Sequence, residues 1–125
     1  MIEQKRHFLE ATNNAEGLLI SRVPEGVELI ALFGKCRVHG HEVVKSHTFP
    51  LEMVREKLAT AGSESVVPYV GSTWLHSERC RIRLVDFLGR KEVEIYFRDP
   101  NPCEHIDLIM VDRAAFMELF EMVTA

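Results

Sequence analysis

The sequence predicts an α+β fold, in which residues 1–125 form a single compact domain with an antiparallel β-sheet of about five to six strands and two or three helices. Strand-like segments are grouped between helix-like segments instead of alternating with them. One segment, residues 80–97, has the pattern of an antiparallel hairpin. The chain of 125 residues is 46% hydrophobic and 27% charged, which suits a domain that buries its own core.

The first part of the chain is expected to begin with a helix over residues 2–14, where Ile2, Phe8 and Leu9 lie on roughly one side. Two strands are expected next, over 17–23 and 27–33, around a Pro-Glu-Gly turn. Gly34 and Gly40 are then expected to break the following region into two short strands.

A clearer helix is predicted over residues 48–62, because Pro50 suits a first helical turn and apolar residues recur at helical spacing. Residues 66–76 are apolar, but Pro68 and Gly71 make them an edge strand or an irregular segment.

The strongest local pattern is "RCRIRLVDFLGRKEVEIYFR", residues 79–98. A turn at Leu88-Gly89 makes one face wholly apolar and places Arg83 opposite Glu94 on the other. The register pairs are Leu84 with Val93, Ile82 with Ile95, Cys80 with Phe97, Arg81 with Tyr96, and Asp86 with Lys91. A hairpin is therefore expected here.

The C-terminal part predicts a strand over 105–111 and a helix that begins after Asp112, a good N-cap residue. The buried side of that helix is expected to carry Phe116, Leu119, Phe120 and Val123. The predicted order is helix, strands, helix, hairpin, strand, helix.

Charge is distributed unevenly along the chain. The net charge is −4, so the whole molecule has no general attraction to polyanions. However, residues 34–47 carry three lysines or arginines against one acid, whereas residues 99–125 carry six acids against one arginine. The middle of the chain is therefore mildly basic and its C-terminal part acidic.

Three widely spaced cysteines argue against a disulfide framework and for a reducing compartment. The start of the chain has no apolar signal-peptide core, and no apolar run approaches the roughly 18–20 residues of a membrane span. A cytoplasmic protein without membrane contact is expected.

Catalytic and metal sites are not predicted. Phosphate-binding glycine loops, nucleophile elbows and zinc-protease motifs are absent from the sequence. Cys36, His39 and His41 do not have the paired spacing of a zinc site, and solvent-facing histidines with core cysteines are the favoured interpretation. Cys103 beside His105 is interpreted as a loop cysteine instead of a nucleophile. We therefore assign no catalytic residue, metal or cofactor.

A basic sheet face is the best positive signal for binding. Arginines alternate along residues 79–83, and basic residues alternate along residues 35–41. If these strands share one sheet, they form a cationic surface that suits phosphates and stacked bases, although Glu94 opposite Arg83 neutralises part of it. The predicted binding residues are Lys35, Arg37, His39, His41, Arg79, Arg81 and Tyr96.

The stretch "VELIALFGKCRVHGHEVVKSHTF", residues 27–49, resembles the β-rich N-terminal region of the RNA-end polynucleotide kinases. The resemblance lies in the apolar strand, two glycines of which the second precedes an acid, and the closing Thr-Phe. It covers under a fifth of the chain, and the phosphate-binding loop of those kinases is absent. The resemblance therefore implies no activity.

The function expected from these observations is that of a non-enzymatic regulator, inhibitor, adaptor or chaperone-like protein whose partner is another protein. The predicted element order is similar, in architecture only, to that of small partner-binding proteins such as secretion chaperones. Two alternatives remain open: a nucleic-acid- or nucleotide-binding domain that uses the basic sheet face, and a small enzyme with an unrecognised site. Self-association is also considered, with the C-terminal methionines as an adaptable surface.

Overall fold

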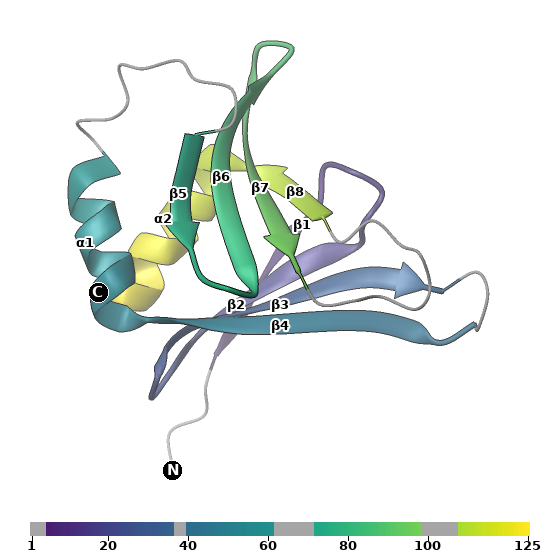
Figure 1. Ribbon diagram of the computed structural model, residues 1–125, viewed down its shortest axis with the longest axis horizontal. Coiled ribbons are helices and arrows are strands. Elements are labelled where there is room, and N and C mark those ends of the chain that lie inside the picture. The colour runs from purple at the N-terminus through teal and green to yellow at the C-terminus, as the bar shows by residue number, and fades with distance from the viewer. Residues whose placement is uncertain (1–4, 37–39, 62–71, 99–107) are drawn as a thin grey trace.

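The computed structural model describes residues 5–36, 40–61, 72–98 and 108–125, which form two four-stranded antiparallel sheets, each followed by a helix (Figure 1). The first half comprises β1 (Arg6–Glu10), β2 (Gly17–Val23), β3 (Gly26–Lys35), β4 (Glu42–Pro50) and α1 (Leu51–Ala61). The second half comprises β5 (Ser72–His76), β6 (Cys80–Phe87), β7 (Arg90–Phe97), β8 (Leu108–Asp112) and α2 (Arg113–Thr124).

The strands of the first sheet lie side by side in sequence order, each antiparallel to the next. Alternation along β2 and β3 turns Leu18, Ile20, Val27 and Leu29 to the inner face, where all four are fully buried. The register between β3 and β4 shifts between Leu32 and Gly34, and Gly34 has a φ of +94°. Gly34 therefore forms a bulge within β3 and does not end the strand, contrary to the sequence prediction.

The second sheet also keeps sequence order, and its β6–β7 hairpin confirms the predicted register at every predicted pair, from Cys80 opposite Phe97 to Asp86 opposite Lys91. The turn residues Leu88 and Gly89 have φ values of 51° and 82°. Positive φ at both turn residues is the conformation whose twist suits a two-residue hairpin. Arg83 and Glu94 form the predicted ion pair, with 3.2 Å between Nη1 and Oε1.

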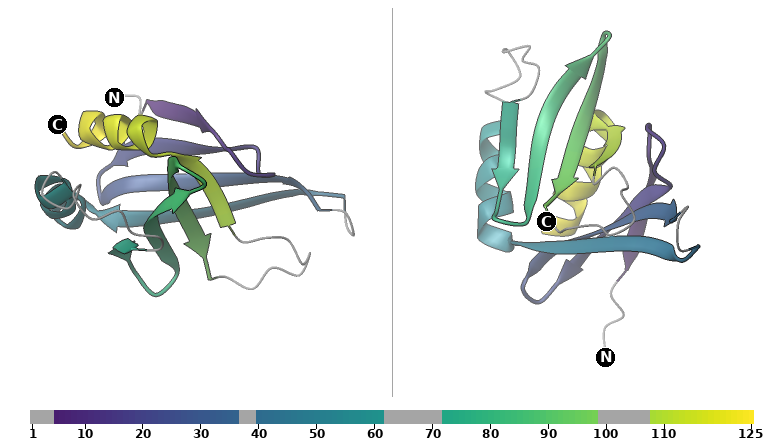
Figure 2. Two further views of the ribbon diagram at one scale, coloured as in Figure 1. Left: turned by 90° about the horizontal axis from the view of Figure 1, so that it is seen from above. Right: turned by 45° about the vertical axis from the view of Figure 1, so that its right-hand side comes forward.

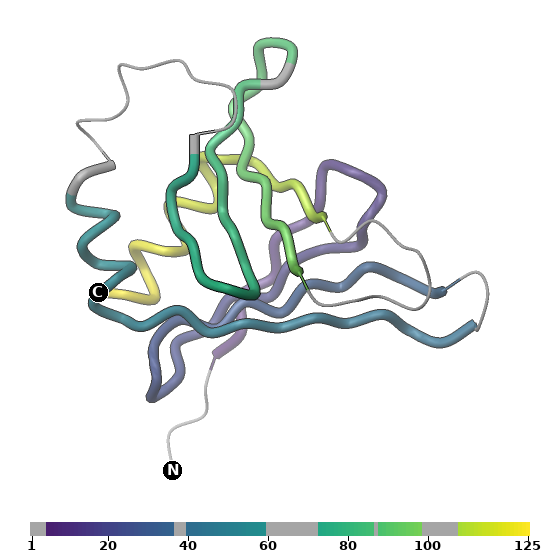
Figure 3. Tube along the Cα trace, viewed as in Figure 1, coloured from purple at the N-terminus to yellow at the C-terminus, as the bar shows by residue number. Residues whose placement is uncertain are grey.

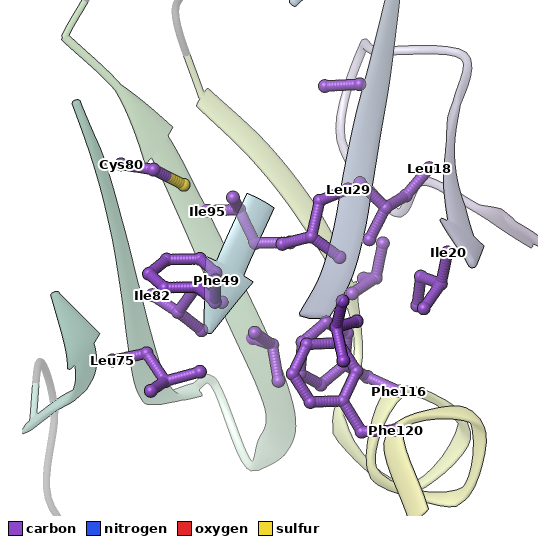
Figure 4. Close-up of a cluster of buried hydrophobic side chains, with 14 of the residues drawn as sticks. Leu18, Ile20, Leu29, Phe49, Leu75, Cys80, Ile82, Ile95, Phe116 and Phe120 are labelled. Atoms are coloured by element: carbon purple, nitrogen blue, oxygen red, sulfur yellow. The ribbon is translucent and has the colours of Figure 1, made fainter. Parts of the chain in front are cut away.

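One hydrophobic core joins the two sheets and α2 (Figure 4). The second sheet runs across the first, and side chains from both sheets point into the space that α2 closes (Figures 2 and 4). Phe116 and Phe120 of α2 lie 4.3 Å apart between ring centroids, and Trp74 of β5 packs against both. Burial of these large apolar side chains is the main source of stability.

The C-terminal helix begins where the sequence predicts. Asp112 is its N-cap, and Asp112 Oδ2 accepts a hydrogen bond of 3.0 Å from the backbone N–H of Ala115. At the other end, Arg22 and Arg55 donate to the carbonyl oxygens of Val123 and Thr124. These arginines satisfy carbonyl groups that have no partner within the helix, and they tie the helix end to β2 and α1.

The predicted fold class is wrong in two respects. The described residues form eight strands in two sheets, not a single sheet of five to six strands, together with two helices. The helix expected over residues 2–14 is absent from the described part of that segment, because residues 6–10 pair in full register with β2 as strand β1. Helical spacing over so few apolar residues is a weak signal, and pairing with β2 overrides it.

The prediction of a single sheet fails at the crossover formed by α1. Helix α1 separates the two groups of strands, and the second group pairs within itself instead of extending the first sheet, as the chain trace shows (Figure 3). The apolar residues at helical spacing in α1 include Leu51, Val54 and Leu58, which pack on the core. No helix in the described part of the chain is long and apolar enough to span a membrane.

The cysteines also differ from the sequence prediction. Cys36 is buried and disulfide-bonded, whereas Cys80 is a buried free thiol; Cys103 lies outside the described residues. The wide spacing and odd number of the cysteines argued against a disulfide framework, yet Cys36 takes part in a disulfide. Sequence separation does not limit a disulfide, because folding can bring distant cysteines together.

Candidate binding surfaces

The described residues of the predicted basic face belong to two sheets, not to one. Lys35 ends β3 and His41 precedes β4 in the first sheet, while Arg81 and Tyr96 lie in the second. Arg37 and His39 lie outside the described residues. Among the described residues of the predicted set, Arg79, Arg81 and Tyr96 come from the β6–β7 hairpin and its ends.

The end of the first sheet near Lys35 is organised by the backbone. The N–H of Cys36 donates to the carbonyl of His41 at 2.8 Å, and Lys35 lies opposite Glu42 in the register. The disulfide occupies the sulfur of Cys36, so this thiol is not a metal ligand. No group of three metal-ligating side chains lies together among the described residues.

Arg81 and Tyr96 form the centre of a cationic and aromatic surface on the outer face of the second sheet. They are cross-strand neighbours, and Arg81 Cζ lies 5.5 Å from the centre of the Tyr96 ring, within the range of a cation–π contact. Arg81 Nε is buried without a hydrogen-bond acceptor. Within the described ranges, no carboxylate forms an ion pair with Arg81. A half-buried cation with an unsatisfied N–H favours an anionic ligand.

Three further basic residues surround this pair. His76 lies opposite Arg81 on β5, and Arg79 and Arg98 are joined by a backbone hydrogen bond of 2.9 Å. His76, Arg79 and Arg98 are all exposed, and Glu78 is the acidic neighbour in the same turn. We call the set Arg79, Arg81, Tyr96, Arg98 and His76 the cationic surface. Trp74 of β5 is not part of this surface, because it is buried in the core at 2% exposure.

An apolar band crosses the outer face of the first sheet, and the sequence analysis did not identify it. Across the pairings of β1 with β2, β2 with β3 and β3 with β4, outward-facing apolar residues lie next to one another. The band consists of Phe8, Leu19, Ile30, Leu32 and Val44. Phe8 and Val44 are 56% and 53% exposed, and the Phe8 ring lies over Gly17.

The second sheet and both helices lie on the inner side of the first sheet, opposite the apolar band, as Figure 1 shows. The band is therefore uncovered by the described part of the chain. A sequence signal for it does exist, because residues 17–20 and 29–33 are apolar at successive positions instead of alternate ones. Such runs indicate that both faces of a strand are apolar.

A pocket of about 490 Å³ lies at the start of α2, between that helix and the turn end of the hairpin. It is lined by Thr12, Arg90, Lys91, Glu92, Asp112, Arg113, Ala114 and Met117. Glu92 is buried directly opposite Asp112 in the register, and Arg113 Nη2 donates to the carbonyl of Val85 at 2.6 Å. The bond to Val85 holds Arg113 against the sheet.

Comparisons with known proteins return no relative. No family model, no curated protein and no solved structure matches this chain. The function must therefore be inferred from the geometry of the two outer faces.

Proposed function

We propose that this chain is a non-enzymatic binding protein that holds an apolar segment of a partner protein on the outer face of its first sheet. The observation that carries the proposal is the apolar band, with Phe8 and Val44 more than half exposed at its ends. Contiguous exposed apolar patches on a protein surface commonly mark interaction sites. The antiparallel sheet beneath the band is a rigid support, because its inner face is packed in the core.

A cytoplasmic location is not part of this proposal. Cys36 is disulfide-bonded, and disulfides are rare in proteins of a reducing compartment.

The test uses a charge placed within the band and the same charge placed outside it on the same face. Ile30→Asp introduces a carboxylate in the middle of the band, whereas Thr48→Asp introduces one in the row formed by Arg6, Ser21 and Glu28. Partners captured from extracts by the parent protein are identified and purified, and their affinity for each variant is measured by calorimetry. We expect Ile30→Asp to weaken binding by about tenfold to a hundredfold, and Thr48→Asp to change it little.

Calorimetry also tests the chemistry of the contact. Docking on an apolar band requires a negative heat-capacity change on binding. Equal affinities for the parent and Ile30→Asp would contradict the proposal.

A second candidate function is the binding of nucleic acid or nucleotides by the cationic surface, and the geometry of Arg81 favours it. Phosphate groups accept hydrogen bonds from arginine, and Tyr96 offers an aromatic ring beside the guanidinium. This candidate uses three of the predicted binding residues, Arg79, Arg81 and Tyr96, and none of the four from residues 35–41.

Two neighbouring arginines of β6 provide a matched comparison for this candidate. Arg83 is ion-paired with Glu94, whereas Arg81 contacts Tyr96. Single-stranded nucleic acid is titrated at two salt concentrations against the parent, Arg81→Gln and Arg83→Gln. We expect affinity that falls steeply with salt and a larger loss for Arg81→Gln. Absence of binding by the parent at low salt, or equal losses in the two variants, would exclude the candidate.

A further inference from the structure

The first sheet has an edge strand, β1, whose sequence is complementary in charge to itself. Strand β1 consists of Arg6, His7, Phe8, Leu9 and Glu10, and among the described strands it pairs with β2 alone. Arg6 and Glu10 are both exposed and lie at equal distances from Phe8 along the strand. An antiparallel copy of β1 centred on Phe8 therefore places Arg6 of each chain opposite Glu10 of the other.

Two of the other three edge strands, β8 and β4, are contacted by segments from elsewhere in the fold. At the edge of β8, the Asn13 side chain donates to the carbonyl of Leu108 and accepts from the N–H of Met110, and Thr12 N–H donates to the Met110 carbonyl. At the edge of β4, His47 shares a hydrogen bond of 2.9 Å with Ser77 of the second half. In the described part of the structure no comparable bond covers β1 on the side away from β2.

The charges on β1 have two interpretations. Charged side chains on an edge strand often prevent pairing with other chains. Charges of one sign achieve this best, because a strand repels its own copy when like charges lie opposite each other. On β1 the two charges have opposite signs and a symmetric placement, so they attract a second copy. The exposed Phe8 ring at the centre adds an apolar contact at the symmetry axis.

We infer that two copies of this chain associate through antiparallel pairing of β1 with its counterpart, which joins their first sheets into one continuous sheet. The apolar bands of the two copies then meet at Phe8 and form one larger surface. A two-fold axis through Phe8 makes each contact occur twice, as in an isologous dimer. The inference does not rest on the partner-binding proposal, because it is argued from the charges and the edge position of β1. The two can fail separately, since Ile30→Asp alters the band and leaves β1 unchanged.

The first test is a charge exchange followed by analytical ultracentrifugation. Arg6→Glu and Glu10→Arg each place like charges opposite each other, so each variant alone is expected to dissociate at least tenfold more readily than the parent. An equimolar mixture of the two variants restores opposite charges in the mixed dimer, and the double variant restores them in its own dimer. Glu56→Arg, on the exposed surface of α1, is the control and is expected to leave the dimer intact.

The second test is a cross-link between symmetric positions. Phe8→Cys places a thiol opposite its own copy, whereas Val44→Cys places a thiol of similar exposure on β4. Mild oxidation is expected to yield covalent dimers of Phe8→Cys well ahead of Val44→Cys. A parent protein that stays monomeric at high concentration overturns the inference. The inference is also overturned if neither single charge variant weakens the dimer, or if the two cysteine variants cross-link equally. Circular dichroism verifies that each variant is folded.

Discussion

The outer faces of the two sheets differ in chemistry although the sheets share one topology. Each is a four-stranded antiparallel sheet in sequence order, and each leads into a helix. The first exposes the apolar band centred on Ile30, whereas the second exposes the Arg83–Glu94 ion pair and the Arg81–Tyr96 contact. The comparison shows that the backbone arrangement positions surface residues, while their identity decides what each surface recognises.

The two helices show a similar contrast. Helix α2 contributes the fully buried Phe116 and Phe120 to the shared core, whereas α1 contributes Val54 as its one fully buried residue among those described. The helix after the second sheet therefore closes the core, and the helix after the first sheet covers its side. The two halves are not interchangeable despite their common element order.

The largest expected effect comes from placing the same charge on the inner and the outer face. Ile95 of β7 is fully buried, whereas Ile30 of β3 is half-buried on the outer face. We expect Ile95→Asp to lower the free energy of unfolding by about 4 kcal/mol or more, because the core offers no compensation for a buried carboxylate. Ile30→Asp is expected to cost about 1 kcal/mol. Chemical denaturation measures both, and similar losses would contradict the assignment of faces.

A buried thiol on the inner face of the second sheet predicts a pH dependence. Burial raises the pKa of Cys80 from 9.0 to about 12. The thiol therefore keeps its proton in the folded state after the unfolded state has lost it. Stability from this group is present below pH 9 and is lost as the pH rises from 9 towards 12.

The expected loss at pH 10 is about 1.4 kcal/mol relative to pH 8. Denaturation of the parent and of Cys80→Ala at the two pH values isolates the effect from other titrating groups. An equal pH dependence in both proteins would show that Cys80 does not couple to folding. In the native parent at pH 8, thiol reagents are expected to leave Cys80 unmodified.

The smallest expected effect concerns the charged outer face of the second sheet. Arg83→Glu places a carboxylate opposite Glu94 and is expected to cost up to about 1 kcal/mol. Adding Glu94→Arg restores opposite charges, so the double variant should recover part of the loss. Thermal denaturation at low and high salt measures the difference, which should shrink at high salt. No loss in Arg83→Glu would mean that the ion pair is energetically neutral.

The sequence alone determined the features that depend on neighbours along the chain. The β6–β7 register follows from residues 80–97, because side-chain polarity, opposite charges and the Leu88-Gly89 turn all favour one pairing. Helix α2 and its Asp112 cap are likewise local, since the cap bond spans three residues. The same β6–β7 register places two of the predicted binding residues, Arg81 and Tyr96, opposite each other.

Only the tertiary structure decided how distant segments meet. Residues 6–10 are a strand because β2 pairs with them, and the chain divides into two sheets because the second group of strands pairs within itself. Lys35 and Arg81 consequently lie in different sheets, and the first sheet presents an apolar outer face that nothing in the described chain covers. Such outcomes depend on the packing of many non-local side chains around one core, which periodicity in a single segment does not encode.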